Sequence, residues 1–196
     1  MSAASAAWFV DGSYLYKTWK SLQLSRRLDY LKLRQQLEKE YQATIEDAYY
    51  FNADPDPPSS QSNSFHSFLT KLPPRGPGLR VKLYWLSQKK LFWPADMGGE
   101  PVTHPKTGVQ YELTQQKAVD VGLAFHLVRS FSKRRWNKLF LSAGDGDFHE
   151  VLQYLVETEN VDVYLIGSPD NISSEIRPYA RELFDLRDHI EQISQS

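Results

Sequence analysis

Short apolar runs rich in β-branched and aromatic residues recur along the chain and predict buried strands. Runs dominated by apolar residues are typical of strands that are covered on both faces of a sheet. The predicted strands are Ala7–Val10, Thr44–Phe51, Leu79–Leu86, Leu139–Ser142 and Val161–Ile166.

Segments with helical periodicity lie between these runs. The clearest one starts after Asp29, a predicted N-cap, and places Tyr30, Leu33, Leu37 and Tyr41 on one stripe. Strands that alternate with helices favour parallel pairing through right-handed crossovers. We therefore predict an α/β three-layer sandwich with a mainly parallel sheet of about five strands. The other two predicted helices are Lys117–Arg129 and Phe148–Glu157.

Turn-forming composition marks the predicted loops. Asn52–Ser64 and Pro73–Gly78 are rich in Pro, Ser and Gly, and we expect them to be loops within one domain that covers residues 1–196. The stretch Ser87–Thr114 combines LFWP, a Gly98–Gly99 pair and HPKTG. It predicts an inserted β-hairpin or an irregular flap, and its length makes it a candidate functional loop.

Composition narrows the possible functions only slightly. The chain has 23 Lys+Arg against 24 Asp+Glu, a formal net charge of -1, so attraction for nucleic acid has to come from local patches. It has no cysteine, which excludes disulfides, thiolate zinc sites and a cysteine nucleophile. The sequence contains neither a secretory signal nor an apolar span, so we expect a cytoplasmic protein that does not bind membranes.

Acidic residues follow two of the predicted strands. Asp11 comes directly after WFV, and Asp145 and Asp147 come after LFLSA in the string GDGD. In an open parallel sheet, ligands bind outside the carboxyl ends of the strands. Asp120, in the string KAVDVGLAF, falls in the first turn of the helix before the second of these strands. We expect Gly144 and Gly146 to let the backbone turn sharply and bring the carboxylates near a bound ion.

Four carboxylates without nearby His or Cys suit Mg²⁺ or Mn²⁺, which prefer oxygen ligands. Each residue also has a structural interpretation. Asp11 with Gly12 can be an ordinary turn, Asp147 can cap the helix from Phe148 onward, and Asp120 can cap its own helix. The joint pattern favours a metal site.

The sequence resembles the NYN domain family, including its LabA-like members, a branch of the PIN-like ribonucleases. FVDGSYLY resembles the family's first strand and Asp–Gly turn, KAVDVGLAF its Lys-x-x-Asp helix, and LSAGDGDF its Ser-x-x-Asp-x-Asp-Phe loop. IGSPDNISSEI is a looser match to the last strand and the following turn. The likeness extends from Trp8 to about Leu186.

This resemblance implies a PIN-like parallel sheet, binding of a divalent metal by Asp11, Asp120, Asp145 and Asp147, and cleavage of RNA. The sequence departs from the family at two positions: Tyr14 replaces an Asn in the first motif, and His126 replaces a frequent Asp. Tyr14 removes a compact polar contact, which predicts altered substrate positioning or reduced activity.

Several basic, aromatic and hydroxyl side chains are candidates for substrate binding. Lys117 lies one turn before Asp120 and can pair either with a carboxylate or with a phosphate. Ser142 can hydrogen-bond a phosphate or a loop amide. Lys89, Lys90 and Trp93 have the composition of a platform for single-stranded RNA, although the aromatic residue can equally fold onto the core.

Two other features are expected to be structural. The side chain at position 126 should lie about 240° around the helix from Asp120, so His126 should not share its face. The run Lys133–Arg135 precedes a predicted strand, so it belongs at the opposite edge of the sheet from the acids, and we interpret it as a solvated turn.

Three functional hypotheses follow. The first is a Mg²⁺-dependent or Mn²⁺-dependent ribonuclease acting on RNA, more readily single-stranded, and able to form homo-oligomers. The second is a weak or inactive PIN-like module that binds RNA or a protein partner, as Tyr14 would permit. The third is a phosphohydrolase with Asp11 as covalent nucleophile, which the presence of Ser13 at the position of a second acid disfavours.

Overall fold

The strands form one curled, seven-stranded sheet in the computed structural model, which describes residues 3–55, 57–116 and 118–195. Its order is β4-β3-β2-β1-β5-β6-β7, and each neighbouring pair is parallel except β3 and β4. The strands are β1 (Ala4–Asp11), β2 (Ala43–Asp54), β3 (Arg80–Lys90), β4 (Glu112–Gln116), β5 (Lys138–Ser142), β6 (Asp162–Gly167) and β7 (Ala180–Asp185).

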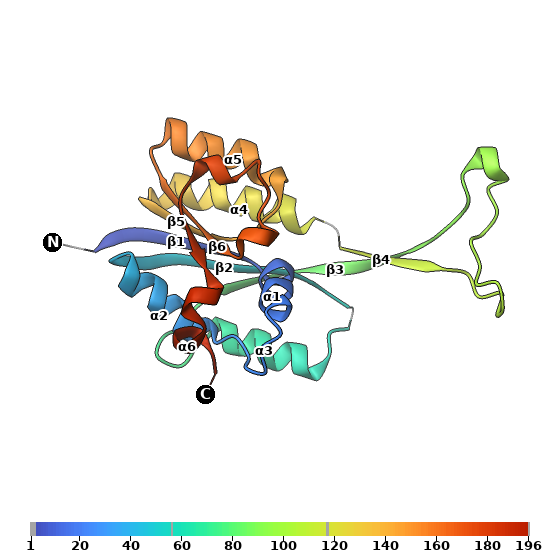
Figure 1. Ribbon diagram of the computed structural model, residues 1–196, viewed down its shortest axis with the longest axis horizontal. Coiled ribbons are helices and arrows are strands. Elements are labelled where there is room, and N and C mark those ends of the chain that lie inside the picture. The colour runs from blue at the N-terminus through green and yellow to red at the C-terminus, as the bar shows by residue number, and fades with distance from the viewer. Residues whose placement is uncertain (1–2, 56, 117, 196) are drawn as a thin grey trace.

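Helices cover both faces of this sheet (Figure 1). The α-helices are α1 (Gly12–Ser21), α2 (Tyr30–Glu40), α3 (Ser60–Thr70), α4 (Val119–Arg134), α5 (His149–Gln153) and α6 (Ile190–Ile193). Short helical segments are η1 (Ala95–Met97), η2 (Gly146–Phe148), the π-helix η3 (Tyr154–Thr158), η4 (Pro169–Asn171), η5 (Arg177–Tyr179) and η6 (Leu186–His189). None of the described helices combines the length and the apolar character that crossing a membrane requires.

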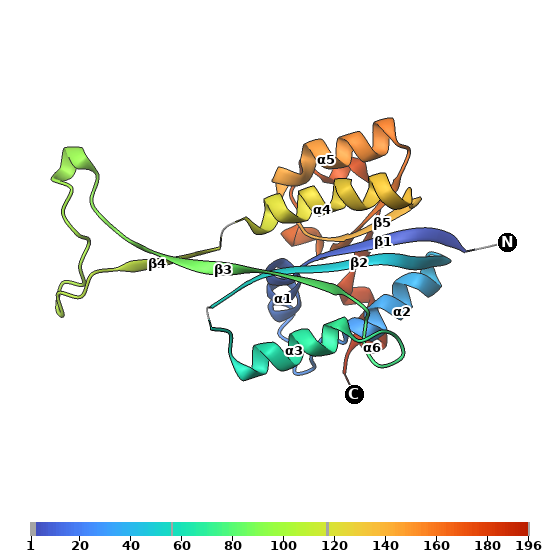
Figure 2. The ribbon, with the colours of Figure 1, turned by 180° about the vertical axis from the view of Figure 1, so that it is seen from behind.

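The two faces of the central strand β1 belong to two different cores. Ala6, Trp8 and Val10 pack with residues of α1, α2, α3 and α6, whereas Ala7 and Phe9 pack with residues of α4 and α5. Because successive side chains of a strand point to opposite faces, one apolar run serves both layers. Figure 2 shows the resulting arrangement of helices, sheet and helices from the other side.

The predicted mainly parallel α/β sheet is confirmed, but the predicted number of about five strands is wrong, because the described residues form seven. All five predicted strands are present, each within a longer or closely matching strand. The two missed strands are at the edges of the sheet. β4 pairs along only one side, and β7 (ARELFD) carries polar residues, so neither contains a long apolar run.

The predicted N-cap is confirmed. The Asp29 carboxylate accepts hydrogen bonds from the backbone N–H groups of Leu31 and Lys32, and α2 starts at Tyr30. The prediction that Asn52–Ser64 is a loop is wrong at both ends. β2 continues to Asp54, and Ser59 caps α3 by accepting a hydrogen bond from the Ser62 amide.

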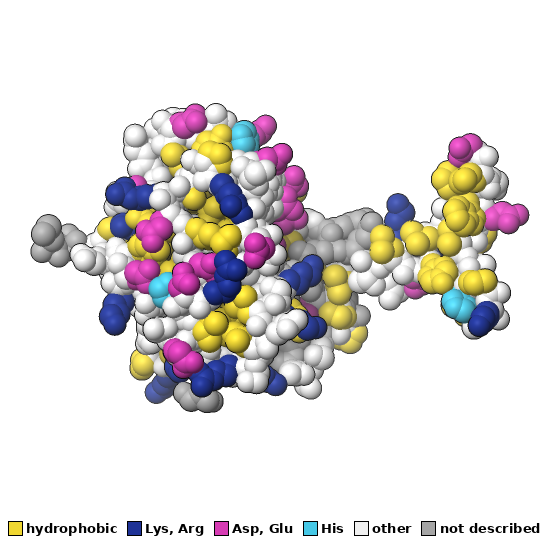
Figure 3. All heavy atoms as spheres, in the orientation of Figure 1, with side chains coloured by type: hydrophobic (Ala, Val, Ile, Leu, Met, Phe, Trp, Pro, Cys, Tyr) yellow, Lys and Arg dark blue, Asp and Glu magenta, His cyan; other side chains and the backbone are white. Residues whose placement is uncertain are grey.

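The segment Ser87–Thr114, here called the arm, projects away from the rest of the molecule (Figures 1 and 2). Its base is the antiparallel pairing of β3 with β4, and isolated bridges join Phe92 to Pro101 and Thr103 to Gln110. Apolar side chains gather on its far part (Figure 3). The exposed large ones are Phe92, Trp93, Met97, Val109, Tyr111 and Leu113.

Candidate active site

The candidate site lies where the direction of chain connection reverses. From β1 the chain moves to β2 and then β3 on one side, and it later crosses to β5 on the other side. β1 and β5 are parallel neighbours, with Val10 opposite Ser142. A crevice outside the carboxyl ends of two such strands is the expected ligand site of an open α/β sheet.

Asp11 ends β1 and caps α1. Its Oδ1 atom accepts a hydrogen bond from the Tyr14 amide at 3.0 Å. Burial raises the pKa of the Asp11 carboxyl above its usual value, and the charge of Asp120 raises it further. The backbone hydrogen bonds from Tyr14 and Ser13 and the charge of Lys17 oppose this rise.

Asp145 follows β5 at the start of η2. Its Oδ1 accepts a hydrogen bond from the Asp147 amide at 3.0 Å, so the capping residue of this turn is Asp145 and not Asp147. Asp145 and Asp147 are both exposed. Asp145 is therefore held by its own loop while its second oxygen stays accessible.

Asp120 interacts electrostatically with Asp11 and also with Asp145 and Asp147. It lies in the first turn of α4, where the helix dipole favours a negative charge. Its pKa is nevertheless raised, first by burial and then by the charges of Asp145 and Asp147. Because Asp120 also raises the pKa of Asp11, the four carboxylates act on one another through Asp120.

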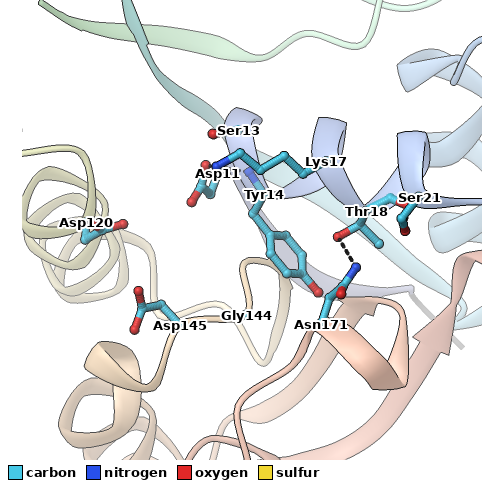
Figure 4. Close-up of a pocket in the computed structure, with 10 residues that line it drawn as sticks. All are labelled: Asp11, Ser13, Tyr14, Lys17, Thr18, Ser21, Asp120, Gly144, Asp145 and Asn171. Carbon is cyan, nitrogen blue, oxygen red and sulfur yellow. Dashed lines mark hydrogen bonds between the residues drawn. The ribbon is translucent and has the colours of Figure 1, made fainter. Parts of the chain in front are cut away.

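A pocket of about 650 Å³ brings three of these carboxylates together (Figure 4). In Figure 4, Asp11 comes from the β1–α1 junction, Asp120 from α4 and Asp145 from the loop after β5, with Tyr14 between them and Asn171. Asp147 does not line the pocket. The lining residues are Asp11, Ser13, Tyr14, Lys17, Thr18, Ser21, Asp120, Gly144, Asp145 and Asn171.

The role of Gly144 differs from the one predicted. Neither Gly144 nor Gly146 has a positive φ, so neither is needed for a left-handed turn. A Cβ on Gly144 would lie 2.2 Å from the Asn171 carbonyl oxygen and 2.4 Å from the Tyr14 ring. Gly144 is thus required because the ring of Tyr14 and the loop carrying Asn171 approach the backbone closely.

Tyr14 fills the inner side of the pocket instead of offering a compact polar group. A Cβ on Gly167 would lie 2.0 Å from the Tyr14 hydroxyl oxygen, which shows how tightly this ring is enclosed. Burial raises the pKa of Tyr14 to about 12. The phenol is therefore neutral at physiological pH, and Tyr14 donates a hydrogen bond to the Asp11 carboxylate from its backbone amide.

The carboxylates surround the pocket without forming a ready ligand shell. Among the described residues, no three His, Cys, Asp or Glu side chains are close enough together to hold a metal ion. The type of donor nevertheless fits a hard divalent cation. Mg²⁺ is usually bound through one or two carboxylates and retains several waters, so separate carboxylates around a wide pocket suit it.

The residues predicted to contact substrate do not lie together in the structure. Ser142 is fully buried, and its hydroxyl accepts a hydrogen bond from the Trp8 indole at 3.1 Å, so the prediction that it contacts substrate is wrong. Lys89, Lys90 and Trp93 lie on the arm and do not line the pocket. Trp93 is exposed, so it does not fold onto the core. Lys117 lies outside the described residues.

Sequence reasoning missed the face that α1 presents to the pocket. Ser13, Lys17 and Ser21 lie on that face at intervals of four residues, and so do the adjacent Tyr14 and Thr18. Because α1 starts directly after Asp11, this periodicity could have identified them. Asn171 belongs to the quoted IGSPDN string, and its Nδ2 donates to the Thr18 hydroxyl at 3.3 Å (Figure 4).

Comparison with known families agrees with this architecture. A model of the NYN domain matches residues 5–187, which is most of the chain. The chain belongs to the NYN domain family. Its curled sheet with helices on both faces is the PIN-like nuclease fold of NYN domains. The LabA-like branch stays a prediction.

A crystal structure of a protein of unknown function from Vibrio parahaemolyticus is similar to this NYN domain over nearly its whole length. The TM-score is 0.64 at 17% sequence identity, and the match covers 99% of this chain and 98% of the other. At this identity the likeness establishes the fold alone. A search of curated protein sequences found no match.

Proposed function

We propose that this NYN domain is a divalent-metal-dependent ribonuclease whose active site is the pocket containing Asp11, Asp120 and Asp145. The observation that carries the proposal is the electrostatic coupling of these carboxylates. They come from three separate parts of the chain and face one pocket, and two of them have raised pKa values caused by burial and mutual repulsion. Such an arrangement lowers folding stability unless a cation compensates it, and it is typical of functional sites.

The residues that would hold the metal are Asp11, Asp120 and Asp145, with Asp147 acting through water or on a second ion. When bound, Mg²⁺ or Mn²⁺ neutralises phosphate charge and lowers the pKa of a bound water. The protein contributes position. Asp11 and Asp145 each have one oxygen fixed by a backbone amide, which leaves the other oxygen for the ion.

Substrate binding near the pocket falls to α1 and to the loop after β6. Lys17 supplies a cation beside Asp11, and Ser13 and Asn171 supply hydrogen-bonding groups. These groups suit a phosphodiester and the sugar next to it. Lys117 is proposed to add a second cation, and Lys89, Lys90 and Trp93 to contact RNA farther from the cleaved bond.

The test is cleavage of labelled single-stranded RNA with Mn²⁺ by the wild type and by Asp145→Asn. We expect the substitution to reduce the rate at least 100-fold, because it removes a charge from the metal site without changing side-chain size. Asp188→Asn, at an exposed aspartate of η6, is the matched control and should cleave normally. An unchanged rate in Asp145→Asn would exclude this active site.

A second candidate function is an RNA-binding module without catalytic activity. It is favoured by the separation of the carboxylates in the described residues and by the space that Tyr14 occupies. RNA binding that persists in excess Mn²⁺ without any cleavage would support this alternative. RNA as the substrate, the cytoplasmic location and homo-oligomerisation remain predictions.

A further inference from the structure

A second pocket, of about 320 Å³, lies between α4 and the strands β2 and β3. We call it the basic groove. It contains none of the residues of the acidic pocket. Its lining residues are Asp47, Tyr49, Arg80, Lys82, His126, Arg129, Ser130, Lys133 and Arg134.

One buried carboxylate organises the guanidinium groups of this groove. Asp47 is 2% exposed, and its Oδ1 lies 2.6 Å from Arg80 and 3.4 Å from Arg134. Its Oδ2 accepts a hydrogen bond from the Ser130 hydroxyl at 2.6 Å, and that hydroxyl accepts one from the Trp136 indole at 3.0 Å. The buried Asp47 carboxylate therefore holds both arginines in place, while about half of each arginine side chain stays exposed.

The remaining cations of the groove are not paired with any carboxylate of the described residues. No Asp or Glu of the described residues lies within ion-pair distance of Lys82, Arg129 or Lys133. The lining contains five Lys or Arg and one Asp, so its formal charge is 5 − 1 = +4 with His126 neutral. Burial and the charges of Lys82 and Arg129 lower the pKa of His126, as expected beside uncompensated positive charge.

The position of the groove relative to the acidic pocket points to an extended ligand. α4 carries Asp120 in its first turn and Arg129, Lys133 and Arg134 towards its end. At 1.5 Å and 100° per residue, Arg129 lies about 14 Å farther along the axis of α4 than Asp120 and about 180° around it, so a ligand that reaches both has to cross the surface of α4. A linear polyanion can span this distance, whereas a single small anion cannot.

We propose that the basic groove binds the phosphate backbone of an RNA strand whose cleaved bond lies in the acidic pocket. The inference rests on the proposed function for the identity of the strand. Without metal, the acidic pocket repels phosphate, so the attraction that recruits RNA has to come from another surface. The groove supplies that attraction, and its contacts to phosphates carry affinity without sequence preference.

The test compares Arg129→Gln/Lys133→Gln with Lys39→Gln/Arg75→Gln in the full chain. The control pair removes the same charge from exposed positions outside both pockets. Binding of a fluorescein-labelled oligouridylate is measured in EDTA over a range of KCl concentrations. Each lost phosphate contact lowers the slope of log affinity against log salt by about 0.7, so the groove variant should lose about 1.4 and the control nothing.

The same experiment separates the two proposals. If RNA binding depends on the groove residues but the wild type does not cleave RNA in Mn²⁺, the groove proposal is supported and the ribonuclease proposal is excluded. If both double variants cleave RNA normally and bind it equally well, the groove proposal is excluded and the ribonuclease proposal is supported. A wild type that binds no RNA, or complete displacement of the RNA by millimolar inorganic phosphate, would overturn the groove as a binding site for a polyanion.

Discussion

Asp11 shows how one side chain can be both a structural cap and a candidate ligand. It starts α1 through its hydrogen bond with the Tyr14 amide, and it lines the acidic pocket. A helix cap contributes about 1 kcal/mol to stability, whereas a buried charge beside a like charge has a free-energy cost. Asparagine keeps the cap and removes the charge, so it separates the two effects.

We therefore expect Asp11→Asn to be more stable than the wild type at neutral pH, by about 0.5–2 kcal/mol. The pKa of Asp11 is raised in the folded chain. Ionisation therefore costs nothing below the unfolded-chain pKa, and the cost grows as pH rises through the folded pKa. The stability gap between the variant and the wild type should be absent in acid and complete at neutral pH, as measured by thermal unfolding at several pH values.

Asp29→Asn is the matched control, because Asp29 caps α2 through the same kind of bond but does not line the acidic pocket. Added Mn²⁺ should raise the melting temperature of the wild type and of Asp29→Asn more than that of Asp11→Asn. A variant at position 11 that is less stable than the wild type at every pH contradicts a repulsive site.

Tyr14 and Gly167 provide a second test at the residue scale. A Cβ at position 167 would lie 2.0 Å from the Tyr14 hydroxyl oxygen but 3.0 Å from the ring carbon that carries it. Gly167→Ala should therefore destabilise the protein by about 1–3 kcal/mol through overpacking. In a Tyr14→Phe background the cost should fall by more than half, as measured by denaturant unfolding of all four proteins in the cycle. Equal costs in both backgrounds would show that the two residues do not compete for space.

At the scale of elements, the sequence pattern identified the strands of the central sheet and missed the elements that have one exposed side. The strands β1, β2, β5 and β6 have apolar runs because two helical layers cover them, whereas β3 has an apolar run although its residues are only partly buried or exposed. β7 and β4 lie at the edges, and α3 (SQSNSFHSFLT) is rich in Ser and Asn, which are typical of loops. Local composition did not indicate these elements, because each has an exposed side and therefore lacks a long apolar run.

The candidate site was predictable to a similar extent. Asp11 and Asp145 follow from the rule that ligands bind at strand ends, and Asp120 joins them in the pocket. The sequence could not show that Asp147 stays outside the lining, or that Ser142 is used to satisfy the Trp8 indole. Both outcomes depend on side-chain directions that are set by packing between distant segments.

The arm is an element whose removal should leave the fold intact. We expect replacement of residues 91–111 by Asn-Gly to change the stability of the remaining domain by less than about 0.5 kcal/mol. The reason is that the far part of the arm extends away from both cores (Figures 1 and 2). Loss of its exposed apolar side chains should also reduce self-association at high protein concentration.

Thermal unfolding and sedimentation velocity would measure these two effects, with Trp93→Ala as a milder variant of the same surface. A large loss of stability would mean that the arm supports the core. Unchanged sedimentation would place any homo-oligomer contact elsewhere on the molecule.

On the scale of the whole molecule, the two pockets are lined by side chains of opposite charge, although the formal net charge of the chain is only -1. The acidic pocket lies at the carboxyl ends of β1 and β5, and the basic groove lies along the later part of α4. The overall balance therefore hides both regions, which is why composition indicated no preference for a polyanion.

The strand order also has a consequence for synthesis of the protein. β1 lies between β2 and β5, so its carboxyl end meets the loop after β5 only when β5 has been made. Asp145 is synthesised 145 − 11 = 134 residues after Asp11. Long-range pairing of this kind forms late during folding. A chain that has not yet been extended through β5 therefore lacks the assembled acidic pocket, so any activity that needs Asp11 and Asp145 together would begin only after that point.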